Sequence, residues 1–145
     1  MKKSLRTLAP VLIGALFLML GSSSLSAQII NDIKAHLDHS FVVGNTTLPP
    51  GEYTFHLMRD SDLAVMVATN ESDKTSVNFL VRETLDEHTP AHSELVFRKY
   101  GNTEVLDKIF EGGSKIGSEV AENSREEARL VHQGLHPVEQ REEQK

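Results

Sequence analysis

The sequence predicts an all-β domain, a small antiparallel sandwich or open barrel of about six strands, with a short C-terminal helix. Apolar residues recur at every second position through most of residues 29–111, which is the period of a strand with one buried face. Polar turn residues interrupt this pattern at short intervals, as in antiparallel sheets. No helix-length apolar pattern lies between these segments, so a parallel sheet covered by helices is not expected.

The expected strands follow one another along the chain. The first spans 33–43, and the others span 53–58, 63–68, 77–81, 94–100 and 103–110. The polar turn at 59–62 should join the second and third strands in a hairpin, and Gly101-Asn102 is typical of a two-residue hairpin turn. Seven aromatic residues occupy positions that should face the core: Phe41, Tyr53, Phe55, Phe79, Phe97, Tyr100 and Phe110.

The chain changes character after Gly113. Ser124 and Glu127 form a capping box, which predicts a helix of about two turns that ends at Val131 or His132. The last segment is strongly charged and offers almost nothing to bury, so a disordered tail is expected there. The predicted organisation is a signal peptide (1–27), a β domain (28–113), a C-terminal extension with the helix (114–136) and the charged tail (137–145).

The first 27 residues have the three parts of a cleavable signal peptide. Lys2, Lys3 and Arg6 precede an apolar stretch at 8–20, and small residues then lead to Ala27. This order is typical of a secretory signal. The apolar stretch is shorter than the roughly 20 residues of a membrane-spanning helix. We therefore expect an exported protein, periplasmic or extracellular, with no membrane anchor after cleavage.

Composition limits the function further. The chain contains no cysteine, so disulfides and thiol chemistry are excluded. Its net charge is −6, and loss of Lys2, Lys3 and Arg6 with the signal peptide makes the mature charge −9. Because phosphate backbones are recognised by basic surfaces, no nucleic-acid partner is expected.

Histidines are the only chemically suggestive residues. His36 and Asp38 share one face of the first strand, and His56 could join them as a metal ligand if the second strand lies alongside. The alternative is that all three are solvated residues on an exposed face. His39 falls at an inward position, where an apolar residue is expected. No motif indicates a catalytic residue or a cofactor.

Two segments resemble a known family. Phe41-Val42-Val43-Gly44-Asn45 is followed by Leu48-Pro49-Pro50-Gly51-Glu52-Tyr53, and Leu95-Val96-Phe97-Arg98-Lys99-Tyr100-Gly101 comes later. These segments resemble the core of a family of small, uncharacterised exported bacterial β-rich proteins. The resemblance covers most of residues 33–131. It implies a β-rich fold and export, and no particular activity.

The sequence thus favours an exported envelope protein that acts as a non-enzymatic binding or interaction module. Its partner would be an unidentified protein or envelope ligand. One alternative is a small-ligand or metal carrier that uses the interior of the β domain or His36 and His56. The second alternative is an enzyme of unknown type.

Overall fold

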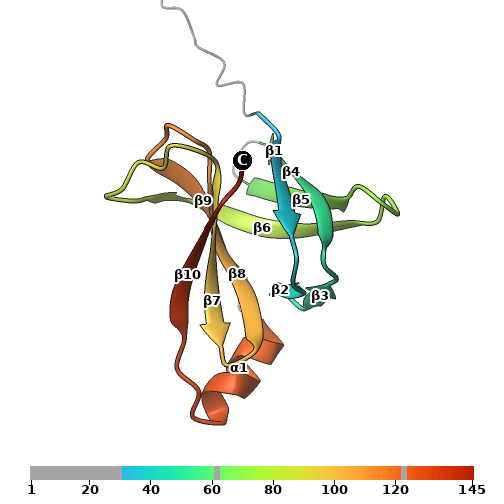
Figure 1. Ribbon diagram of the computed structural model, residues 1–145, viewed down its shortest axis with the longest axis vertical. Coiled ribbons are helices and arrows are strands. Elements are labelled where there is room, and N and C mark those ends of the chain that lie inside the picture. The colour runs from blue at the N-terminus through green and yellow to red at the C-terminus, as the bar shows by residue number, and fades with distance from the viewer. Residues whose placement is uncertain (1–30, 61–62, 122–123) are drawn as a thin grey trace, which may run out of the picture.

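The computed structural model describes residues 31–60, 63–121 and 124–145 (Figure 1). The predicted signal peptide, residues 1–27, lies outside the described residues. In the part of the chain that is described, no helix combines the length and the apolar character needed to cross a membrane.

Ten strands and one short helix make up the described chain, so the expectation of a mostly β protein with a short C-terminal helix is confirmed. The expected number of about six strands is wrong. The elements are β1 (Ile33–Leu37), β2 (Phe41–Val43), β3 (Thr46–Leu48), β4 (Gly51–Asp60), β5 (Leu63–Asn70), β6 (Ser76–Leu85), β7 (Glu94–Tyr100), β8 (Thr103–Phe110), β9 (Ile116–Val120), α1 (Arg125–His132) and β10 (Val138–Glu143).

The strands form one open, mixed sheet rather than the expected antiparallel sandwich or barrel. Their order is β1-β4-β5-β6-β9-β8-β2-β3, and β8 also pairs with β7, which pairs in turn with β10. The pairs are antiparallel except for β2 with β8, which run parallel where Val42 meets Val105. Figure 1 shows β10, β7 and β8 running side by side, with α1 at one end of them.

The first expected strand is in fact two strands. β1 pairs with β4 from Ile33 opposite Phe55 to Leu37 opposite Gly51. Residues 38–40 then leave the ladder, and β2 joins β3 and β8 instead. The alternation of apolar residues continues across this change of partners because it reports which side chains are buried, not which strand lies alongside.

Both predicted hairpins are present. β4 and β5 stay in register from Tyr53 opposite Asn70 to Asp60 opposite Leu63. β7 and β8 are joined at Gly101-Asn102, where Gly101 has a φ of 60°. A positive φ at the first central position is the requirement of a type II′ turn, and glycine meets it without strain.

One apolar cluster holds the sheet together, and β1 to β9 all contribute to it. The sheet therefore curves so that strands distant in the pairing order share one core. The seven aromatic residues predicted to face inward are all buried. Phe41 packs edge-on against both Tyr53 and Phe97, with ring centroids 5.2 and 5.9 Å apart.

The predicted disordered tail is wrong, because residues 138–143 form β10. This strand pairs with β7 in six successive positions, from Val138 opposite Lys99 to Glu143 opposite Glu94. β10 adds no residue to the apolar core. Its backbone ladder and its polar side chains hold it in place, and composition gives no signal of either. The β domain thus extends beyond residue 113 through β9 and β10.

Helix α1 begins where the capping box predicts. The Ser124 hydroxyl accepts hydrogen bonds from the backbone N–H groups of Glu126 and Glu127, which would otherwise lack partners at the helix start. Leu130 packs in a small apolar cluster with Val42, Tyr100 and Val105. This cluster attaches α1 to the sheet beside β2, β7 and β8.

Candidate functional site

The three predicted metal ligands are not brought together. His36 Nδ1 lies 2.6 Å from Glu52 Oε1, and His56 Nδ1 lies 2.5 Å from Asp32 Oδ1. Both pairs link β1 or the residue before it to β4, and both are solvent-exposed. Asp38 lies beyond the end of β1 and contacts a different histidine. The solvated-face interpretation therefore describes His36 and His56.

His39 is placed where its inward position in the sequence suggested. It sits in the connection between β1 and β2, and its side chain is 24% exposed. Its ring packs edge-on against Phe97 with the centroids 5.5 Å apart. One side of the imidazole is thus held by the core while its two nitrogens face polar groups.

Three side chains from separate parts of the sequence meet at His39. His39 Nε2 lies 2.5 Å from Glu104 Oε2 on β8 and 3.7 Å from Glu142 Oε1 on β10. One ligand atom of each residue lies within 4.8 Å of the other two. Among the described residues, this is the one group of three or more histidine and acidic side chains placed closely enough to hold a metal ion.

Asp38 fixes the orientation of the His39 ring. Its Oδ1 lies 3.1 Å from His39 Nδ1. A carboxylate can only accept here, so Nδ1 is the donor. This hydrogen bond lowers the pKa of Asp38. In the neutral imidazole, Nε2 is then left with its lone pair directed toward the glutamates.

The facing atoms of His39 and Glu104 are buried. Among residues 31–60, 63–121 and 124–145, neither His39 Nε2 nor Glu104 Oε2 has a hydrogen-bond partner, although they are 2.5 Å apart. The Glu104 side chain is only 8% exposed. Two acceptors at this distance repel each other, and a buried polar atom without a partner costs about 1–3 kcal/mol. A cation, either a proton or a metal ion, would remove this penalty.

An open basin of about 640 Å³ lies over this group. We call it the seam basin because its lining includes residues of both β1 and β10. At its rim the backbone N–H of His36 donates to Gln144 Oε1 over 3.0 Å. The seam basin is lined by His36, Asp38, His39, Lys99, Glu104, Gln140, Glu142, Glu143 and Gln144.

The charge of the seam basin favours a cation. Four carboxylates line it against one ammonium group, that of Lys99. Lys99 Nζ lies 2.9 Å from Glu104 Oε1, which leaves the other oxygen of Glu104 directed at His39. Lys99 therefore neutralises part of the negative charge without filling the space between the three ligand atoms.

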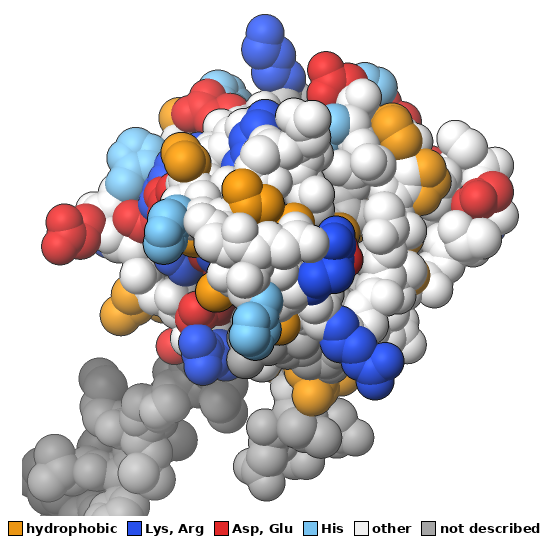
Figure 2. Space-filling model, turned by 90° about the horizontal axis from the view of Figure 1, so that it is seen from below, with side chains coloured by type: hydrophobic (Ala, Val, Ile, Leu, Met, Phe, Trp, Pro, Cys, Tyr) orange, Lys and Arg blue, Asp and Glu red, His pale blue; other side chains and the backbone are white. Residues whose placement is uncertain are grey.

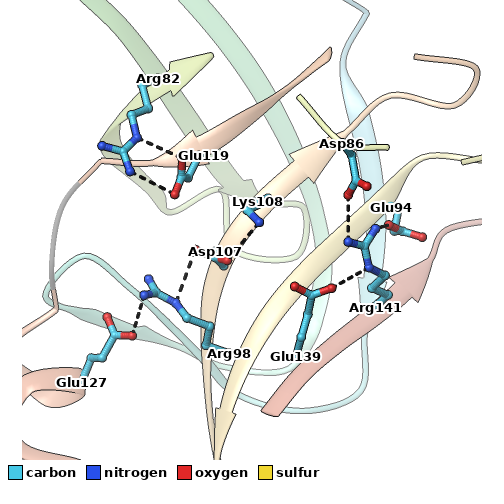
Figure 3. A network of polar contacts seen from close by, with 10 residues as sticks. All are labelled: Arg82, Asp86, Glu94, Arg98, Asp107, Lys108, Glu119, Glu127, Glu139 and Arg141. Atoms are coloured by element: carbon cyan, nitrogen blue, oxygen red, sulfur yellow. Dashed lines mark hydrogen bonds and ion pairs between the residues drawn. The ribbon is translucent and has the colours of Figure 1, made fainter. Parts of the chain in front are cut away.

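Arginine networks brace β7, β8 and β10, three strands that contribute to the lining of the seam basin (Figure 3). Arg141 of β10 contacts three carboxylates, those of Asp86, Glu94 and Glu139. Arg98 of β7 lies 2.9 Å from Glu127 of α1 and 3.3 Å from Asp107 of β8. These contacts fix β7, β8 and β10 relative to one another, and so they fix the elements that carry Glu104 and Glu142.

A second pocket lies at another part of the sheet, between β1, β4 and β5 on one side and β8 and β9 on the other. Its lining is partly apolar and includes Ile33, Phe55, Met66 and Ile109. Its volume is about 80 Å³, room for only a few water molecules, whereas small-molecule sites hold roughly 300–1,000 Å³. This pocket gives little support to a carrier that holds an organic ligand inside the β domain.

Sequence reasoning missed Glu104 and Glu142. Glu104 did carry a signal, because it shares the period-two face of Leu106, which is fully buried. A glutamate on a core-facing position requires a partner. Glu142 had no such signal in the sequence, because this residue lies in a charged segment that predicts disorder.

Comparisons with family models, with curated proteins and with solved structures give no match. The function of the protein is therefore inferred from the geometry of the seam basin.

Proposed function

We propose that the mature chain is an exported, non-enzymatic binding module whose ligand site is the seam basin. One observation carries the proposal. His39 Nε2 and Glu104 Oε2 face each other, buried and without a hydrogen-bond partner in the described part of the chain, and both residues line an open acidic basin. An arrangement that is unfavourable when empty and accessible from solvent is typical of a site that is completed by its ligand.

The lining favours binding over group transfer. The side chains of the seam basin are histidine, acidic, amide and lysine groups, without a hydroxyl or thiol nucleophile. Its negative charge selects a ligand with a positive charge. Figure 2 shows charged, histidine and apolar side chains intermingled over one face of the molecule, without a large apolar patch on that face.

Export is part of this proposal and rests on the signal-like order of residues 1–27. A cleaved signal predicts that the chain recovered from its host begins near Gln28. A binding module of the envelope meets its ligand outside the cytoplasm, so protein purified from the envelope fraction should carry that ligand.

Native mass spectrometry of the chain recovered from its own host tests both parts. We expect a mass that begins near Gln28 together with a bound mass, and we expect the bound mass to be lost in the double variant E104Q/E142Q. The control is H56Q, which removes an exposed histidine outside the lining of the seam basin and should keep the bound mass. A chain that retains residues 1–27 would contradict export, and a bare wild-type chain would contradict the binding function.

A further inference from the structure

We propose that the ligand of the seam basin is a divalent first-row transition metal ion of the zinc type, held by His39 Nε2, Glu104 and Glu142. This inference rests on the proposed function and names its ligand class. It differs from the site that the sequence suggested, since neither His36 nor His56 belongs to the group of ligands. The three ligands come from the β1–β2 connection, from β8 and from β10.

The distances suit one metal ion. Zinc binds histidine nitrogen and carboxylate oxygen at about 2.0–2.2 Å, so two of its ligand atoms lie about 3–4 Å apart. The 3.7 Å from His39 Nε2 to Glu142 Oε1 already meets this requirement. The 2.5 Å between His39 Nε2 and Glu104 Oε2 must widen by about 1 Å, which side-chain rotation can supply. Because the three ligands line the seam basin, a water molecule there would serve as the fourth ligand of a tetrahedral ion.

Asp38 supplies the outer contact that metal-bound histidines usually have. A histidine ligand typically donates its other ring N–H to a carboxylate, which fixes the tautomer and strengthens the nitrogen as a ligand. His39 Nδ1 makes this contact with Asp38 Oδ1 at 3.1 Å. Packing of the ring against Phe97 restricts it further, so His39 is oriented before any ion binds.

A metal ion explains the geometry better than a proton on His39. A protonated Nε2 would donate to a carboxylate along a straight line, but the contact of His39 with Glu104 is not aligned for a hydrogen bond. Glu142 also lies near the same nitrogen, and a single N–H group cannot donate equally well to both carboxylates. Three ligand atoms converging on one point are the arrangement that a metal ion requires.

The ligand chemistry selects the class of metal. Imidazole nitrogen favours zinc, copper, iron or nickel, whereas magnesium and calcium prefer oxygen ligands alone. Lys99 opposes binding, because its ammonium group lies against Glu104. Removal of that charge should strengthen the site.

The bound ion would also crosslink β10 to the connection that follows β1. Glu142 belongs to β10, which adds nothing to the apolar core, while His39 follows β1 at the opposite end of the pairing order. A metal that joins them would link the two ends of the open sheet, so binding should raise the melting temperature of the protein.

Isothermal titration calorimetry with Zn²⁺ tests this on the chain recovered from its host and stripped with a chelator. We expect one ion per chain, no binding of Mg²⁺ at the same concentration, and a raised melting temperature. H39Q and E142Q should each weaken Zn²⁺ binding by about 100-fold or more, and D38N by about 10- to 100-fold. H56Q, which removes an exposed histidine outside the lining of the seam basin, should bind as the wild type does, and K99Q should bind more tightly.

Three results would overturn the inference: no stoichiometric Zn²⁺ on the wild type, full affinity in E142Q, or loss of affinity in H56Q. Circular dichroism of each variant shows whether it has folded, and K99Q gives a gain of affinity that misfolding cannot mimic. If the recovered chain carries an organic cation and the stripped chain binds no Zn²⁺, the proposed binding function stands and the metal inference fails.

Discussion

Arg141 of β10 donates to Glu94 of β7 across the last strand pair, with Nη1 2.9 Å from Glu94 Oε1. The Glu94 side chain is only 4% exposed, so this guanidinium is a counter-charge for a buried carboxylate. The same group reaches Asp86, whose pKa is lowered by a hydrogen bond from the backbone N–H of His88 and then by Arg141. The terminal strand is thus attached by the side chain of Arg141 as well as by its backbone ladder with β7.

Replacing this arginine should destabilise the protein. R141Q leaves the Glu94 carboxylate buried without its counter-charge, and we expect a loss of about 2 kcal/mol in the free energy of unfolding. Urea denaturation measures it. The matched control is R129Q on α1, where the arginine pairs with Glu126 at the exposed surface and its loss should matter far less. Equal effects of the two substitutions would contradict this role for Arg141.

Deletion of β10 should uncover a sheet edge. A chain that ends at Pro137 exposes the backbone of β7 from Glu94 to Lys99, and unpaired strand edges promote association. We expect lower stability and concentration-dependent association, measured by analytical ultracentrifugation. The control is a chain that ends at Glu143, which keeps all six pairs of β10 and should remain monodisperse. A Pro137 chain that behaves like this control would show that β10 is not docked in solution.

Tyr100 should make stability decrease at alkaline pH. Burial and then its hydrogen bond to Glu127 raise the pKa of Tyr100 from 10.0 to about 12. Between these values the folded state keeps a proton that the unfolded state loses. The stabilisation is therefore complete below pH 10 and is lost as the pH rises toward 12, on the order of 2 kcal/mol.

Comparison of wild type with Y100F isolates this effect. Urea denaturation between pH 9 and 12 should show a steeper loss of stability for the wild type than for Y100F. The other groups that titrate in this range are common to both proteins and cancel in the difference. Parallel curves would show that Tyr100 is not perturbed.

Gly117 should not tolerate a side chain. A Cβ added there would lie 2.4 Å from Phe110 Cδ1 and 2.6 Å from the carbonyl oxygen of Ile109. The ring belongs to the core and the carbonyl to the backbone of β8, so neither can move at little cost. We expect G117A to lose about 1–3 kcal/mol of stability, measured by thermal denaturation. S118A, at the next position of β9, is the control and should be nearly neutral.

The sequence correctly predicted the features of the fold that depend on residues close together in the chain. The alternating pattern placed Phe41, Tyr53 and Phe97 in the core, and the structure buries all three. Ser124 predicted the start of α1 because a capping side chain acts on amides only two and three residues away. These features depend on residues near one another in the chain, so a single sequence contains them.

Strand partners were decided only by the tertiary structure. β10 carries almost no apolar residues, and its place beside β7 depends on backbone hydrogen bonds, which any sequence can form. The group at His39 could not be predicted for the same reason. The strand pattern suggested that His36 and His56 could lie side by side, but each pairs with its own carboxylate. His39, Glu104 and Glu142 meet because β8, β10 and the end of β1 converge.

The sequence by itself determined which side chains are buried, where the helix begins and that no thiol chemistry is available, because each follows from composition or from neighbouring residues. Only the tertiary structure decided the number and order of the strands, the docking of the charged C-terminal segment and the convergence of His39 with two distant glutamates. The physical reason is that burial is encoded by the period of the side chains, while strand pairing uses backbone groups that are alike at every position.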